Sequence, residues 1–216
     1  MKGALTNQRA FAALIAIIGW SALVLQLGLT LSAVMAQGRS AAAGIWLYLG
    51  YFTILTNILV AITMTLVAFH RWPGGAKPNA GAMTGVAMAI GVVGVVYHLL
   101  LSGKVPELTS FGWLADRTMH YLVPMLTLLF WVACVPKSGL TYTDPFRWII
   151  YPVCYLAYAM VRGSFDGWYP YFFIDVSALG YQKAMLNAAV LSVGVLIIGF
   201  FIVFVSRMLH ARKNTN

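Results

Sequence analysis

Thr53 and His120 have the side chains in this sequence that best fit a chemical reaction. Each lies early in a long apolar segment. Polar and ionisable groups are costly in hydrocarbon, so a histidine in such a segment indicates a functional site. A hydroxyl within its reach would make a nucleophile and a base. The alternatives are a threonine that back-bonds to its own helix and a histidine that only links two helices.

Further polar residues share helix faces with this pair. Thr56 and Asn57 follow Thr53 on one side of the same segment. Gly91, Gly94 and His98 form a stripe in a neighbouring segment. Small residues let membrane helices approach closely, so this stripe should face the bundle and turn His98 inward. His98 is then a second base, an orienting partner or a structural contact.

A later segment carries tyrosines and a cation at helical spacing. Tyr151, Tyr155, Tyr158 and Arg162 lie on one helix face, where the hydroxyls would form a ladder that ends at the guanidinium. Arg162 either binds a carboxylate or phosphate or extends to the membrane interface. Asp175, further on, is either a solvated acid or the third member of a triad that orients a histidine.

The composition predicts a membrane protein. Of the 216 residues 61% are hydrophobic and 9% are charged, against about 25% charged in soluble domains. The net charge of +9 comes from scattered lysines and arginines, which favours anionic lipid over nucleic acid as the partner. Both cysteines lie in apolar segments, so we expect no disulfide framework. The sequence has no metal-ligand spacing, phosphate loop or dinucleotide fingerprint, so we expect no metal or other cofactor.

Six apolar stretches predict an all-α integral membrane protein, a six-helix bundle in a single domain over residues 1–216. The first is too long for the core of a signal peptide, so we expect an uncleaved first helix. No soluble domain or internal repeat interrupts the series. The stretches are 11–35, 45–69, 84–102, 118–135, 148–161 and 184–209.

Lysines and arginines predict that both termini are cytoplasmic. Nine of them fall on the side of the termini and five in the loops on the other side, where four of the five acids, Glu107, Asp116, Asp166 and Asp175, also lie. In this orientation Thr53, His98, His120 and Arg162 meet in the outer half of the membrane. The nine are Lys2, Arg9, Arg71, Lys77, Lys137, Arg147, Arg207, Arg212 and Lys213, and the five are Arg39, Lys104, Arg117, Arg162 and Lys183.

The predicted fifth loop, residues 163–183, is long and rich in aromatic residues. One interpretation is a cap that folds back over the outer mouth of the bundle and presents Asp166 and Asp175. The other is an aromatic belt at the membrane interface, where tyrosine and tryptophan are common. The two interpretations are compatible.

Short motifs resemble a known family. Tyr51-Phe52-Thr53, together with Met119-His120 and Pro124, is similar to the androgen-induced membrane hydrolases. That resemblance implies Thr53 as nucleophile and His120 as base in cleavage of fatty acid esters of hydroxy fatty acids, with Thr56 one turn away as the alternative nucleophile. The stretch from Tyr151 to Asp175 resembles a bacterial branch of small six-helix membrane proteins, which implies the inner membrane of a bacterium. That second resemblance covers most of the chain from residue 45 onward.

The leading hypothesis is therefore an integral membrane hydrolase of lipid esters. The alternative is a non-enzymatic binder or carrier of a lipid or small amphiphile in the same polar pocket. A third hypothesis, a structural or assembly partner, predicts that Thr53, His98 and His120 tolerate substitution. Secondary transporters usually show paired repeats or broken helices, and the sequence shows neither.

Overall fold

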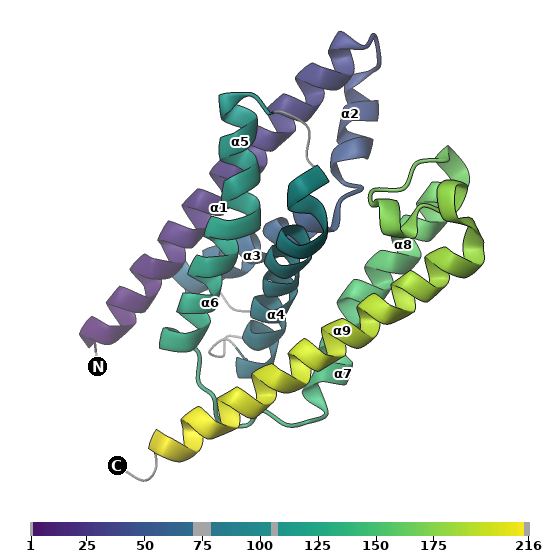
Figure 1. The fold of residues 1–216 in the computed structure, drawn as a ribbon. Coiled ribbons are helices and arrows are strands. Elements are labelled where there is room, and N and C mark those ends of the chain that lie inside the picture. Colours follow the sequence, from purple (N-terminus) through teal and green to yellow (C-terminus); the bar gives the residue numbers. More distant parts are fainter. Residues whose placement is uncertain (1, 71–78, 105–107, 214–216) are drawn as a thin grey trace. The chain divides into compact units, whose positions relative to one another are not determined.

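The computed structural model describes residues 2–70, 79–104 and 108–213. Throughout this part of the chain the regular structure is helical and no strand occurs, as the sequence predicts. The chain forms two compact units, Met1–Pro136 and Lys137–Asn216 (Figure 1). Arg71, Lys77 and Glu107, three of the charges behind the predicted orientation, lie outside the described residues.

Several helices are long and apolar enough to cross a membrane. Four helical segments reach that length by themselves. A pair of helices separated by a sharp bend is a fifth candidate if the two together form one span. These helices suit an integral membrane protein, since about 20 apolar residues span the hydrocarbon core. The expected fifth span corresponds to α8, which has 17 residues and is shorter than these segments. The four are Thr6–Ala36, Ala80–Lys104, Ser110–Cys134 and Val176–Met208.

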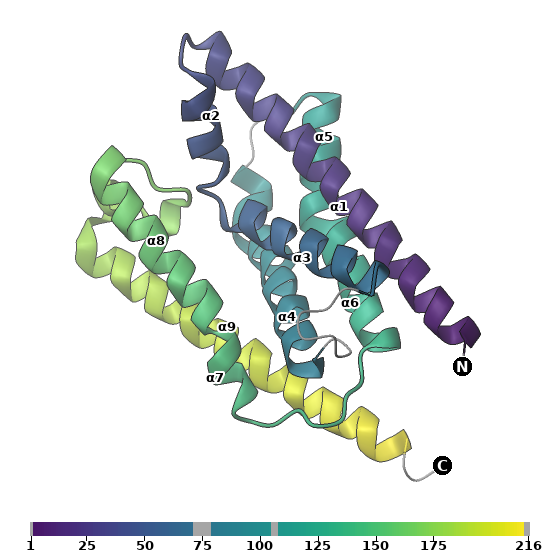
Figure 2. The same ribbon diagram turned by 180° about the vertical axis from the view of Figure 1, so that it is seen from behind.

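Helix α1 organises the first unit. It runs over Lys2–Ala36, about 52 Å at 1.5 Å per residue, and packs against α2, α3, α5 and α6 (Figures 1 and 2). Leu23 of α1 joins Tyr48, Ile54 and Met119 in a buried apolar cluster. The hydroxyl of Tyr48 donates to the carbonyl of Leu23 at 2.8 Å. The helices that carry Thr53 and His120 thus share one core.

The predicted helix 45–69 is wrong as a continuous span. The structure has two helices, α2 (Ala41–Tyr48) and α3 (Phe52–Ala68), bent by 80°. Tyr51 at the bend has an extended backbone, φ −89° and ψ 132°, so the first helix cannot continue through it. Thr53 consequently becomes the second residue of a new helix rather than a residue deep within a long one.

The third apolar segment starts as α4 (Ala80–Val96) and changes its winding near its end. A π-helical turn, η1 (Tyr97–Leu101), follows, and a 3₁₀ turn, η2 (Ser102–Lys104), completes it. In η1 the Ser102 N–H donates to the carbonyl of Tyr97, five residues back. Residues after this turn no longer follow the 3.6-residue spacing of α4.

The fourth segment also contains a π-helical turn. It runs through α5 (Ser110–Arg117), η3 (Thr118–Leu122) and α6 (Val123–Cys134). The predicted start at residue 118 is eight residues late, because the charged end of α5 was assigned to a loop. Asp116, placed in that loop, is therefore a helical residue.

The second unit consists of three helices and a short link. These are α7 (Asp144–Trp148), α8 (Ile150–Asp166) and α9 (Val176–Lys213), and the link contains a 3₁₀ turn, η4 (Phe172–Ile174). α9 has a non-helical residue at Gly180, with φ 74° and ψ 158°.

The predicted loop 163–183 is wrong in its extent. Because α8 continues to Asp166 and α9 begins at Val176, only residues 167–175 connect them. The aromatic link packs on its own helices: Ile174 is buried, and Asn187 of α9 donates to the carbonyl of Phe173 at 2.9 Å. The ring of Tyr169 covers Gly163, where a Cβ would not fit.

Candidate functional site

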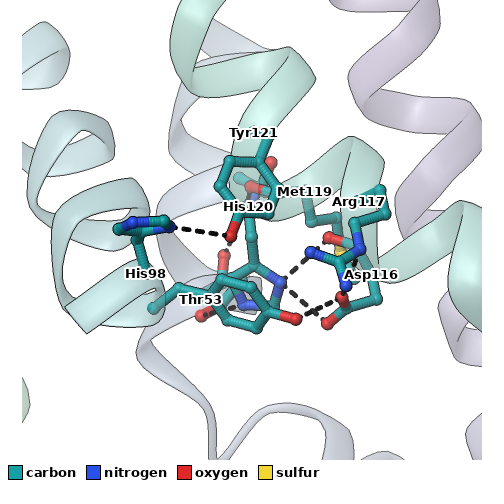
Figure 3. Close-up of polar contacts among 9 residues, drawn as sticks. Thr53, His98, Asp116, Arg117, Met119, His120 and Tyr121 are labelled. Atoms are coloured by element: carbon teal, nitrogen blue, oxygen red, sulfur yellow. Dashed lines mark hydrogen bonds and ion pairs between the residues drawn. The ribbon is translucent and has the colours of Figure 1, made fainter. Parts of the chain in front are cut away.

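Thr53 and His120 meet in the first unit. The Thr53 hydroxyl oxygen lies 3.2 Å from Nε2 of His120 (Figure 3). The two residues are 67 positions apart in sequence, and α3 and η3 bring them together. Thr53 is 8% exposed, and Thr56, one turn on, is fully buried. The contact required of a nucleophile and its base is therefore present at Thr53.

The other ring nitrogen of His120 faces Asp116. Nδ1 lies 3.0 Å from Oδ1 of Asp116 and 2.9 Å from its backbone carbonyl oxygen (Figure 3). A backbone carbonyl only accepts hydrogen bonds, so Nδ1 carries the proton. In the neutral ring Nε2 is then the acceptor, and it faces the Thr53 hydroxyl. Asp116 thus fixes the tautomer in which His120 can act as a base.

Tyr97 contacts both Asp116 and His120. Its hydroxyl donates to Oδ2 of Asp116, and its ring stacks on the His120 ring at a centroid distance of 3.8 Å and an angle of 16°. Tyr97 is 2% exposed and Asp116 is 9% exposed. The carboxylate therefore has a donor on each oxygen, and the imidazole has a flat neighbour that restricts its rotation.

Two π-helical turns carry this arrangement. Tyr97 is the first residue of η1, and His120 is the middle residue of η3. Such turns are rare and occur frequently at functional sites. The helices can approach here because Gly94 lies against the His120 carbonyl oxygen, which would be 3.2 Å from a Cβ at position 94. Pro124 also lies against Gly94, so the helix pair is closely packed beside the site.

The prediction that His98 turns inward is wrong. His98 is exposed, whereas its neighbour Tyr97 is buried, because the π-helical turn changes the phase of the helix at this point. Nδ1 of His98 lies 3.3 Å from the hydroxyl of Tyr121 (Figure 3). The Arg117 guanidinium lies over the same tyrosine ring at 5.4 Å, and its Nε is 3.9 Å from Asp116. His98 is therefore a neighbour of the cluster on its exposed side.

Asn57 links the two elements that carry the pair. Its side-chain amide nitrogen donates to the carbonyl of Thr53 at 2.8 Å and to the carbonyl of Met119 at 3.3 Å. Asn57 is fully buried. It supports the site through the backbone carbonyls of Thr53 and Met119 rather than through the side chains of the reacting pair.

Four other predicted site residues belong to the second unit. Arg162 is 3% exposed, its Nε lies 3.4 Å from Asp166, and it donates to the hydroxyl of Tyr158 at 3.3 Å. Tyr155 is buried next to Tyr158. Asp175 caps α9 by accepting hydrogen bonds from the N–H groups of the second and third residues of that helix, Ser177 and Ala178. The convergence of these residues with Thr53 stays a prediction.

The cluster in the first unit suits acyl transfer. Hydroxyl, imidazole and carboxylate follow one another at distances of 3.2 Å and 3.0 Å, as in a nucleophile activated by an oriented base. Within the residues that the structure describes, no three histidine, cysteine, aspartate or glutamate side chains are grouped to hold a metal ion.

Two members of the cluster were not predicted as site residues. Asp116 was counted only as a loop charge, although its spacing of four residues from His120 puts both on one helix face. The helical spacing predicts the adjacent His98, and not Tyr97, as the inward-facing residue. An aspartate four residues before a histidine at the start of an apolar segment is the signal in the sequence that identifies Asp116.

Comparisons with protein-family models, with curated proteins and with solved structures found no match for this chain. The similarity to the androgen-induced membrane hydrolases therefore stays a prediction. It rests on the residues around Thr53 and His120.

Proposed function

We propose that this protein is an integral membrane hydrolase of lipid esters. One observation carries the proposal: the Thr53 hydroxyl lies 3.2 Å from Nε2 of His120, and Nδ1 of the same ring lies 3.0 Å from the buried carboxylate of Asp116. Threonine hydroxyls are poor nucleophiles unless an adjacent base takes their proton. The chain supplies that base in the correct tautomer, next to helices that are apolar enough for a membrane.

In the first half of the reaction, His120 Nε2 takes the Thr53 proton as the threonine oxygen attacks the ester carbonyl carbon. The resulting tetrahedral intermediate collapses, and the alkoxide leaving group takes the proton back from His120 and departs as an alcohol. An acyl group then remains on Thr53. In the second half, water attacks the acyl group through the same base, which releases the fatty acid and restores the threonine.

The start of α3 would stabilise the negative charge of the intermediate. Thr53 is the second residue of that helix, and no side chain caps it at Tyr51. The first N–H groups of a helix lack intrahelical acceptors and carry the positive end of its dipole. We assign the N–H groups of Thr53 and Ile54 as the donors to the oxyanion.

The substrate would be a membrane lipid or lipid-like ester that enters laterally from the bilayer. We propose six spans with both termini in the cytoplasm, which makes α8 and the bent α2–α3 pair part of the membrane domain. The ester then lies near the outer interface of a bacterial inner membrane.

Covalent labelling with a fluorophosphonate tests the activated hydroxyl. Purified protein in detergent should react, while Thr53→Ala and His120→Ala should lose labelling and keep their helical circular dichroism. Thr65→Ala is the matched control, because Thr65 lies on α3 but its hydroxyl bonds to the carbonyl of Ala61 at 2.7 Å. That variant should label like the wild type.

Two results would contradict the proposal. Labelling that survives in Thr53→Ala would place the nucleophile elsewhere, and a folded wild type that never labels would remove the evidence for activation. In the second case, tight binding of a lipid ester without release of product would favour a non-enzymatic lipid binder or carrier.

A further inference from the structure

Asn57 makes a side-chain contact that bridges the backbones of the two segments that carry Thr53 and His120. Its amide nitrogen lies 2.8 Å from the carbonyl oxygen of Thr53 itself and 3.3 Å from that of Met119, the residue before His120. The first acceptor belongs to α3 and the second to η3. A single amide group thus holds the nucleophile's helix against the turn that carries the base.

The backbone of η3 explains why the second acceptor needs a donor. In this turn the N–H of Val123 donates to the carbonyl of Thr118, five residues back. Continued by one residue, the same pattern would pair residue 124 with the carbonyl of Met119. Residue 124 is proline and has no N–H to donate. In a membrane, backbone groups freed by proline must find partners on neighbouring elements, and Asn57 supplies one.

The orientation of the amide group is set by these contacts. Both acceptors are carbonyl oxygens, so the nitrogen must point toward them and the oxygen away. Oδ1 of Asn57 is buried and makes no hydrogen bond within the described residues. An unpaired buried oxygen is unfavourable. Leucine would avoid that penalty, but the link between α3 and η3 would then have no donor.

We infer that Asn57 is a positioning residue, which sets the distance between the Thr53 hydroxyl and His120 by tying α3 to the π-helical turn η3. The inference rests on the proposed hydrolase function. Asn57 is fully buried and acts through backbone groups, so its loss changes the rate of the chemical step and leaves substrate binding intact. A misplacement of about 1 Å between reacting groups lowers the rate about 100-fold.

The test compares Asn57→Leu and Asn57→Asp with the wild type. Leucine removes the amide with little change in volume, and aspartate keeps the shape but has no N–H donor when ionised. Thr127→Val is the matched control, because Thr127 is a buried residue of the first unit whose hydroxyl makes no hydrogen bond in the described structure. Each variant is measured by its labelling rate over a range of fluorophosphonate concentrations and by thermal unfolding.

We expect both Asn57 variants to lose about 100-fold in maximal labelling rate with an unchanged half-saturating concentration. Thr127→Val should match the wild type in both. Wild-type rates in folded Asn57 variants would overturn the inference. Failure of both variants to fold, while Thr127→Val folds, would also overturn it, because Asn57 would then be an architectural residue.

A second readout separates this inference from the proposed function. In protein labelled with ¹⁵N-histidine, the Nε2 resonance of His120 reports its contact with Thr53 without any reaction. If the wild type does not react with the probe, the hydrolase proposal fails, and the resonance alone decides the positioning role. A shift in Asn57→Leu supports that role, and an unchanged resonance contradicts it.

Discussion

The two units each contain a buried charged group surrounded by aromatic residues, but the groups are assembled differently. In the first unit, Asp116, His120, Tyr97 and Thr53 come from three separate helical segments. In the second unit, Arg162 contacts Tyr158 and Asp166, each four residues away on α8. The ring of Trp168, in the link that follows, lies 5.0 Å from the guanidinium.

This difference shows that a buried and paired charge does not by itself indicate a catalytic site. Contacts at a spacing of four residues form whenever a helix forms, so the Arg162 cluster needs no special positioning. The first cluster needs a bend before α3, two π-helical turns and a close approach at Gly94. These features are costly in a helix and gather around one hydroxyl and one imidazole, as expected of a site that performs a reaction.

The largest effect should come from Thr53→Ala compared with Thr56→Ala. Removal of the Thr53 hydroxyl should lower the hydrolysis of a p-nitrophenyl ester at least about 10³-fold, because no other group replaces the nucleophile. Thr56→Ala should keep most of the activity. Loss of activity in Thr56→Ala but not in Thr53→Ala would show that the nucleophile is Thr56, one turn further along α3, and would contradict the assignment.

Asp116→Asn and Asp166→Asn test the two carboxylates against each other. Asparagine at 116 removes the negative charge that stabilises the imidazolium formed when His120 takes the proton. The backbone carbonyl of residue 116 still holds the proton on Nδ1, so kcat should fall by about 10²–10⁴-fold without a change of tautomer. Asp166→Asn should leave kcat unchanged, since Asp166 contacts Arg162 in the second unit. Equal losses of kcat in the two variants would show that the two carboxylates do not differ in their contribution to the reaction.

Tyr97→Phe and Tyr97→Leu separate the two contacts of Tyr97. Phenylalanine keeps the ring stacked on His120 but removes the hydrogen bond to Asp116, which should lower kcat about tenfold. Leucine removes both contacts and should lower kcat further. If Tyr97→Phe has wild-type kinetics, the hydroxyl does not contribute to the orientation of the carboxylate.

Arg162→Lys should have the smallest effect on the reaction. Lysine cannot reproduce the planar contacts with Asp166, Tyr158 and the Trp168 ring, so we expect a loss of stability of about 1–3 kcal/mol. Thermal unfolding in detergent measures this loss. An unchanged KM would confirm a structural cluster, whereas a raised KM for anionic esters alone would make Arg162 a substrate anchor.

Hydropathy and residue type were enough to predict the helical class and several of the apolar helices, and to single out Thr53 and His120, which the structure brings within 3.2 Å of each other. They could not predict the bend at Tyr51, because both sides of it are equally apolar. They also placed Asp116 in a loop, since a charged residue ends an apolar run by definition. The π-helical turn at Tyr97 broke the helical spacing that had assigned the inward position to His98.

The most direct test of the account is to identify the residue that carries the covalent adduct. Wild-type protein is treated with a fluorophosphonate, digested and analysed by mass spectrometry, with His120→Ala as the control. If His120 activates Thr53, the wild type carries a single adduct on Thr53 that is absent from the control. An adduct on another residue, or none on folded protein, would contradict the assignment of Thr53 as an activated nucleophile.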